Sequence, residues 1–208
     1  MSLPVNGNSR PGQPGLTMQA PTYAPTAVAL HWVLVLVVFV LYGIGWYMVG
    51  IPKGTPPVAY YYNLHKSIGI VAALPIVWLI LWRATHVPPP LPGSLAAWQA
   101  RAAHINHLLF YICLVVLVVS GFIESNFTKF GIRFFGYPLP RLFAEDKTLY
   151  WIFNRIHVYT SYFFAALVAI HITAALRHLF VHRDGVFQRM WFGASPKSDL
   201  GVTGRNHP

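Results

Sequence analysis

Four long stretches without charged residues constrain this chain more than any other feature of its sequence. They cover residues 27–52, 67–82, 102–123 and 156–176, and aromatic and polar residues from position 60 extend the second at its start. About 20 apolar residues are needed to cross a bilayer. Backbone groups in hydrocarbon must satisfy one another, and these stretches are too long for barrel strands, so they are expected to be helices. We therefore predict an all-α integral membrane protein, a four-helix up-down bundle.

The segments between and beyond these stretches are rich in proline and glycine. We predict a membrane domain over residues 24–192, a disordered amino-terminal tail over 1–23, and a flexible carboxy-terminal tail over 193–208. The amino-terminal tail has no basic start followed by an apolar core, so it does not resemble a signal peptide. Three connecting loops are expected at 51–59, 84–100 and 125–150.

The basic residues indicate an orientation and not a nucleic-acid partner. The formal charge is +10, but the basic residues lie between apolar stretches and form no continuous patch. With the amino terminus inside, eight Lys and Arg residues fall on the inner side and seven on the outer side. Arg177, Arg183 and Arg189, after the fourth stretch, give the best support. The positive-inside rule then predicts that both termini are cytoplasmic.

Four of the ten histidines fall at matched depths in the bilayer. His31 lies about one turn into the first helix, His65 starts the second, and His157 and His171 are 14 residues apart on the fourth. Fourteen helical residues rise about 21 Å and return to nearly the same face. Because successive helices alternate in direction, His31 pairs with His171 on the inner side. His65 pairs with His157 on the outer side.

Two histidine pairs inside a bilayer indicate a cofactor, although a single histidine in a membrane helix can be a simple polar contact. A mononuclear zinc or copper site would gather three or four ligands at one level. An arrangement of two and two favours bis-histidine haem b held between the helices. Covalent attachment through C-x-x-C-H is excluded because Cys113 is the single cysteine. His104 and His107 share a face of the third helix and stay open as alternative inner ligands.

Several short motifs resemble the prokaryotic cytochrome b561 family over roughly residues 24–192. They are Ala29-Leu30-His31-Trp32, Leu64-His65-Lys66-Ser67-Ile68-Gly69, Ala103-His104-Ile105-Asn106-His107, and the His157/His171 pair followed by Ala174-Ala175-Leu176-Arg177-His178. In that family the first two helices give one axial histidine each and the fourth gives two. The resemblance therefore implies that His31, His65, His157 and His171 bind the iron of two non-covalent haem b groups. Six-helix, ascorbate-dependent relatives are a poorer match for four spans.

The same resemblance implies an oxidoreductase of the bacterial inner membrane. It would pass electrons between an outer one-electron donor and membrane quinone, with ubiquinone as the expected substrate. Some members resemble superoxide oxidases, and an outer loop with Lys129, Arg133 and Arg141 would attract a small anion such as superoxide. A docking face for an acidic protein donor, or a loop that is merely solvated, explains that charge equally well. The alternative functions are a cytochrome b anchor of a larger hydrogenase- or dehydrogenase-like complex and a haem-free transporter.

A few residues beside the histidines are further candidates. Lys66 and Arg155 flank the outer ligands and are candidate partners of the haem propionates, which need cations near the interface. His178, two turns beyond His171, is a candidate proton donor at a quinone site, because histidine titrates near neutral pH. Small residues near the ligands would leave room for a flat macrocycle: Gly43, Gly45, Ser67 and Gly69.

Overall fold

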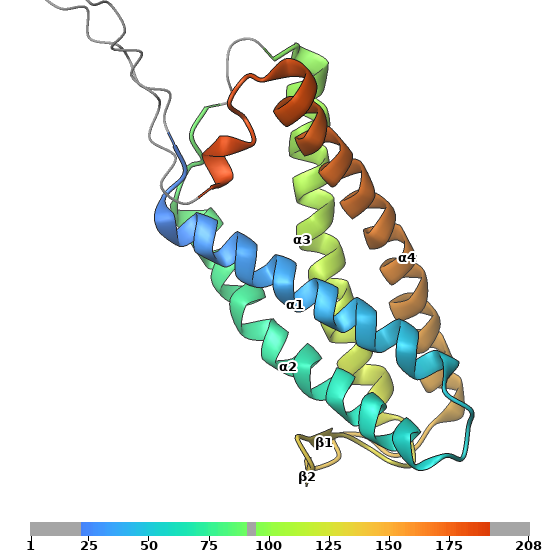
Figure 1. The fold of residues 1–208 in the computed structure, drawn as a ribbon. Coiled ribbons are helices and arrows are strands. Elements are labelled where there is room, and N and C mark those ends of the chain that lie inside the picture. The colour runs from blue at the N-terminus through green and yellow to red at the C-terminus, as the bar shows by residue number, and fades with distance from the viewer. Residues whose placement is uncertain (1–21, 91–94, 192–208) are drawn as a thin grey trace, which may run out of the picture.

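Four long helices make up nearly all of the structure, a computed structural model that describes residues 22–90 and 95–191 (Figure 1). Each is long and apolar enough to cross a membrane. The prediction of an all-α, four-helix membrane protein is confirmed. The predicted tails lie almost entirely outside the described residues. The helices are α1 (Pro25–Gly50), α2 (Pro56–Thr85), α3 (Ala97–Asn126) and α4 (Lys147–Arg177).

The helices are longer than the charge-free stretches that predicted them. The fourth stretch was expected to begin at residue 156, but α4 begins at Lys147. Asp146 caps it, since its carboxylate accepts a hydrogen bond of 3.0 Å from the backbone N–H of Leu149. Proline at the first turn starts α1 and α2, where its missing N–H costs nothing. A charge-free stretch therefore measures the thickness of the hydrocarbon, and helices continue past it into the interface.

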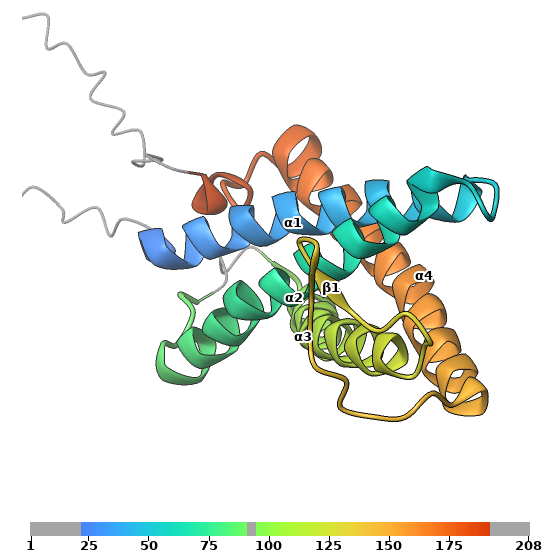
Figure 2. The same ribbon diagram turned by 90° about the horizontal axis from the view of Figure 1, so that it is seen from below.

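The helices alternate in direction, and each one packs against the next in sequence (Figures 1 and 2). α1 and α4 meet near their middles, where the hydroxyl of Tyr42 donates a 2.6 Å hydrogen bond to the carbonyl of Ser161. The ring of Tyr42 also stacks on Phe164. We call the end with the start of α1 and the end of α4 the terminal end. The opposite end, which carries β1 and β2, is the hairpin end.

The buried core is small and lies at mid-height between all four helices. Most apolar side chains point outwards, as expected where lipid and not water surrounds the protein. Phe164 is buried in this core, seven residues from each of His157 and His171, so its side chain fills space between their levels. The core cluster consists of Leu34, Ala72, Ile76, Cys113, Leu114, Phe164 and Leu167.

A short hairpin covers the hairpin end. It pairs β1 (Arg133–Phe134) with β2 (Tyr137–Pro138) in antiparallel register. The turn between them places Phe135 at φ 46° and Gly136 at φ 96°. Positive φ at both central residues is the geometry that suits the twist of two paired strands. Phe135 is strained there because it is not glycine, so contacts outside the hairpin must hold the turn in place.

Those contacts come from α2, directly beside His65. Ser67 is fully buried, and its hydroxyl oxygen accepts a 2.8 Å hydrogen bond from the backbone N–H of Phe135. Its single proton has two carbonyl acceptors in reach, that of Asn63 in its own helix at 2.7 Å and that of Arg133 at 3.1 Å. The ammonium of Lys66 donates to the carbonyl of Gly131 at 3.2 Å. The loop is thus fastened to the helix that carries a candidate ligand. Ser67 serves this fastening, whereas the sequence had suggested only that it leaves space.

At the terminal end the chain folds back after α4. A π-helical turn (His178–His182) and a short 3-10 helix (Gln188–Met190) follow. The indole N–H of Trp32 donates a 2.8 Å hydrogen bond to the carbonyl of Met190, and Arg189 donates to the carbonyl of Pro90 at 3.0 Å. The segment after α4 is therefore fixed both to α1, beside His31, and to the loop that follows α2.

Candidate haem-binding sites

His65 of α2 and His157 of α4 face each other near the hairpin end. Their ring centres are 6.3 Å apart, and their ring planes cross at 83°. Both α2 and α4 begin at this end of the bundle. Residues early in the two helices, such as these histidines, therefore lie at one level. The structure thus brings together the pair that was predicted for the outer side.

The separation of 6.3 Å fits an iron ion between the two rings. A metal–nitrogen bond to histidine is about 2.0–2.1 Å, so an imidazole–metal–imidazole unit places its ring centres about 6 Å apart. A direct hydrogen bond between the two ring nitrogens would bring the centres closer. The residues at this level therefore fit a group that is bound axially from both sides.

The ring of His157 is held in a defined orientation. Its Nδ1 lies 2.9 Å from the carbonyl oxygen of Leu117 and 3.3 Å from the hydroxyl of Ser120, both on α3. A ring N–H at Nδ1 can donate to that carbonyl, which leaves Nε2 without a proton and free to bind a metal. Histidine ligands commonly use their second nitrogen in this way, since it fixes both tautomer and ring orientation.

Two glycines give the histidine rings of this pair their space. A Cβ added at Gly121 of α3 would lie 3.0 Å from Cε1 of His157, and one at Gly45 of α1 would lie 3.4 Å from Cε1 of His65. Gly43 and Gly69 have nothing within 4 Å of such a Cβ, so of the glycines predicted to make room only Gly45 does so. Gly121 was missed, although a glycine near the end of the third charge-free stretch was visible in the sequence.

His31 of α1 and His171 of α4 form the second pair, at the terminal end. Their ring centres are also 6.3 Å apart, with planes at 58°. Trp32 packs edge-on against His31 at 5.3 Å, and Phe110 of α3 packs edge-on against His171 at 5.4 Å. The predicted inner pair is therefore also brought together, at the same spacing as the first.

His107 of α3 joins this second pair as a third histidine. Its ring centre is 5.5 Å from that of His171, which is short for a shared axial metal. His104 is exposed, and its Nδ1 lies 2.7 Å from the carbonyl of Ala100 in its own helix. Of the two alternative inner ligands, the structure brings only His107 to the pair. The spacing favours His31 and His171 as ligands, with His107 beside them.

The two pairs lie at separate levels of one scaffold. His157 and His171 both lie within α4, which is helical without interruption from Lys147 to Arg177. Their separation along the axis is about 21 Å at 1.5 Å per residue. The four histidines come from three helices, so the packing of α1, α2 and α4 sets both sites at once.

The two candidate propionate partners differ in their surroundings. Lys66 is held between the carbonyl of Gly131 and the charge of Glu124. Glu124, which the sequence marked only as the end of a span, is hydrogen-bonded by Asn154, and its Oε2 is buried without a partner. Arg155 is exposed and forms no ion pair or hydrogen bond with the described part of the chain. The structure thus places Lys66, but not Arg155, in a polar cluster inside the bundle.

His178 lies where the sequence expected a proton donor. Its Nδ1 is 2.7 Å from Oδ2 of Asp184, and both side chains are largely buried. They line a small cavity of about 160 Å³ at the terminal end. The pairing holds the ring in place. The cavity is lined by Leu95, Gln99, His178, His182 and Asp184.

The fold and these sites define a class of protein: a multi-pass, helical membrane protein with paired histidines suited to hold haem. The comparisons agree. A family model for prokaryotic cytochrome b561 matches residues 22–193, and the chain belongs to that family. The family consists of membrane b-type cytochromes that bind haem b and transport electrons.

Three relatives illustrate the range of the family. Cytochrome b561 homolog 2 of Escherichia coli (strain K12) is 30% identical over 185 residues, which cover 86% of this chain and 95% of the relative. Cytochrome b561 homolog 1 of the same strain is 25% identical, covering 81% and 96%. "Probable superoxide oxidase CybB" of Yersinia pestis is 22% identical, covering 81% and 94%. The similarity thus extends over almost the full length of each relative.

Proposed function

We propose that this chain holds two haem b groups, one at each histidine pair, and conducts electrons from the hairpin end to a quinone at the terminal end. The observation that carries the proposal is the equal spacing of 6.3 Å in both pairs. Haem b bound by two histidines supplies one-electron redox chemistry. The chain itself fixes the two levels, orients His157 through Leu117, and keeps water out with apolar packing between the levels.

At the hairpin end, the proposed donor is superoxide. The loop there exposes Lys129 and Arg133, while Arg141 donates a hydrogen bond to the carbonyl of Lys129 and so also shapes the loop. Exposed cations attract a small anion and raise its rate of encounter. The relative named as a probable superoxide oxidase supports this choice of donor. Each superoxide ion gives up one electron at this end and leaves as dioxygen.

At the terminal end, the proposed acceptor is ubiquinone. Reduction of one quinone takes two electrons, from two superoxide ions, and two protons. His178 and Asp184 line a cavity at the terminal end and provide groups that can hold and pass a proton. Reduction at a site that supplies protons yields the neutral quinol, which can return to the bilayer.

The charged residues support a further assignment and an orientation. We assign Lys66 as the propionate partner at the hairpin end, because an ammonium group has three donors and only one is used on Gly131. Arg155 is the second candidate, at the interface. The hairpin end would face the outside of a bacterial inner membrane, and the terminal end would face the cytoplasm. This orientation agrees with the greater number of basic residues at the terminal end.

The test is quinone reduction by the purified, haem-loaded protein under a steady flux of superoxide. The rate should fall as salt is raised, because the Debye length shrinks from about 30 Å at 0.01 M to about 10 Å at 0.1 M. The double variant Lys129→Gln with Arg133→Gln should be slower at low salt and less sensitive to salt. Arg101→Gln is the matched control, an exposed cation of α3 at the terminal end, away from this loop.

Two results would count against the proposal. A rate of quinone reduction that changes neither with salt nor with the double substitution would exclude electrostatic capture of superoxide. Absence of any quinone reduction by protein that holds its haem would favour the other function, a cytochrome b subunit that relays electrons within a larger complex. Co-purification of a stoichiometric partner would then be expected.

A further inference from the structure

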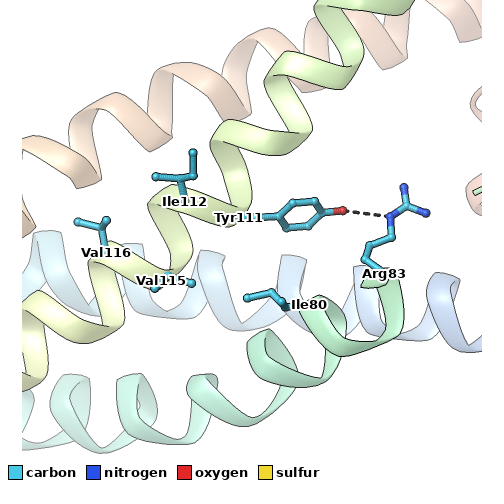
Figure 3. Close-up of a pocket in the computed structure, with 6 residues that line it drawn as sticks. All are labelled: Ile80, Arg83, Tyr111, Ile112, Val115 and Val116. Carbon is cyan, nitrogen blue, oxygen red and sulfur yellow. Dashed lines mark hydrogen bonds between the residues drawn. The ribbon is translucent and has the colours of Figure 1, made fainter. Parts of the chain in front are cut away.

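A groove between α2 and α3 opens on the lipid-facing side of the terminal half of the bundle. Its volume is about 360 Å³. Ile112 and Val115 on its wall are nearly half exposed, so in the membrane they meet acyl chains and not water. Figure 3 shows aliphatic side chains along one part of the groove and the side chains of Tyr111 and Arg83 at one end. The lining residues are Ile80, Arg83, Tyr111, Ile112, Val115 and Val116.

The polar end of this groove carries a positive charge. Nε of Arg83 donates a 3.2 Å hydrogen bond to the hydroxyl of Tyr111 (Figure 3), which leaves the two terminal nitrogens of the guanidinium for another acceptor. Arg83 lies two residues before the end of α2, at the depth where a helix leaves the hydrocarbon. No carboxylate within residues 22–90 and 95–191 pairs with it.

The surroundings reinforce this charge. The guanidinium carbon of Arg83 lies 5.8 Å from the ring centre of Tyr23, and that of Arg189 lies 5.5 Å from the same ring. Two cations therefore approach one aromatic side chain. Among the described residues, Asp184 is the single acid at this end of the bundle, and it contacts His178. The groove thus has apolar walls along its length and a positively charged end that attracts anions.

We propose that this groove is a binding site for an anionic phospholipid. The phosphodiester accepts hydrogen bonds from Arg83 and Tyr111, and one acyl chain lies along Ile80, Ile112 and the two valines. Basic pockets between helices are the recognised form of such sites. A quinone fits less well, because its neutral carbonyls would leave the guanidinium without a counter-charge in a poorly solvated place. This site is separate from the cavity beside His178.

The test uses native mass spectrometry of the haem-loaded protein in detergent, titrated with dioleoyl-phosphatidylglycerol or dioleoyl-phosphatidylcholine. Retention of one phosphatidylglycerol, several-fold above phosphatidylcholine, is expected. Arg83→Gln should abolish this preference, and Val115→Trp should reduce retention by filling the groove. Arg101→Gln is the control, because Arg101 is an exposed cation in the first turns of α3, at the terminal end. Haem content and the absorption spectrum, measured in parallel, show that each variant is folded.

Three outcomes would overturn the proposal. Equal retention of the two lipids by the unmodified protein would show that the groove does not select an anion. Equal loss of preference in Arg83→Gln and Arg101→Gln would assign the effect to general surface charge. Stoichiometric displacement of phosphatidylglycerol by ubiquinone, abolished by Val115→Trp, would identify the groove as a quinone site. None of these readouts depends on electron-transfer activity, so the result is independent of the proposed donor and acceptor.

Discussion

Gly121 of α3 lies so close to His157 of α4 that a Cβ at this position would be 3.0 Å from the imidazole Cε1 and 3.1 Å from Nδ1. The ring cannot retreat freely, because its Nδ1 is held by the carbonyl of Leu117. A glycine in one helix therefore sets the position of a candidate ligand in another. The relationship gives a sharp test of the site at the hairpin end.

We predict that Gly121→Ala disturbs the hairpin-end haem and that Gly43→Ala does not. Alanine is intrinsically better than glycine in a helix by roughly 1 kcal/mol, so Gly43→Ala, with no atom within 4 Å of the new Cβ, should be neutral or stabilising. At Gly121 the ring must shift by a few tenths of an ångström. The measurements are haem content and the low-spin absorption of the two variants. Identical spectra and haem content would contradict the close contact.

Substitution of the ligands should remove the haems separately. His65→Ala or His157→Ala should lower the haem content from about two to about one per chain, and His31→Ala or His171→Ala should do the same for the other site, since one axial bond of two is lost. Pyridine haemochrome analysis gives the count. His104→Ala, at an exposed position, is the control.

The same series decides between the two candidate ligands at the terminal end. His107 lies 5.5 Å from His171, whereas His31 lies 6.3 Å from it. We expect His107→Ala to keep both haems, with a modest spectral shift at most. If His107→Ala lost a haem while His31→Ala kept both, the assignment of the inner ligand would pass to His107.

The sequence predicted the helices and the histidine pairs well because both follow from periodicity and depth. A charge-free stretch must cross the bilayer, and 14 residues of helix must place His157 and His171 on one face. Periodicity and depth could not predict the side-chain contacts between helices. That Gly121, and not Gly43, meets a histidine depends on how α3 rotates against α4, which no local pattern records.

The loop at the hairpin end shows the same limit. Its proline and glycine content indicated a partly structured loop, but not that Ser67 would be its anchor. A serine two residues after a histidine reads equally well as a small residue that makes room. The difference lies in contacts more than 60 residues apart in sequence, which only the folded chain brings together.

We predict that Ser67→Ala loosens the hairpin. The variant would leave the backbone N–H of Phe135 without its acceptor on α2, a loss of about 0.5–1.5 kcal/mol for a typical hydrogen bond. Limited proteolysis of the loop should become faster and the thermal midpoint should fall. Ser161→Ala is the control, since Ser161 is only partly buried and its hydroxyl bonds only within its own helix. Equal proteolysis rates in both variants would exclude an anchoring role.

The last prediction concerns His178 and its partner Asp184. The two side chains form a 2.7 Å contact beside a cavity at the terminal end, some seven residues beyond His171. If they supply protons to a bound quinone, His178→Gln should slow quinone reduction strongly while both haems are retained, because glutamine can hydrogen-bond but cannot deliver a proton near neutral pH.

Asp184→Asn should act in the same direction but more weakly, since the imidazole of His178 is kept and loses only the carboxylate that contacts its Nδ1. The decisive comparison separates reduction of the haems by dithionite from oxidation of the reduced haems by added ubiquinone. In His178→Gln the first should be unchanged and the second slowed, and His104→Gln should match the unmodified protein in both. Unchanged oxidation by ubiquinone in His178→Gln would place the quinone elsewhere at the terminal end.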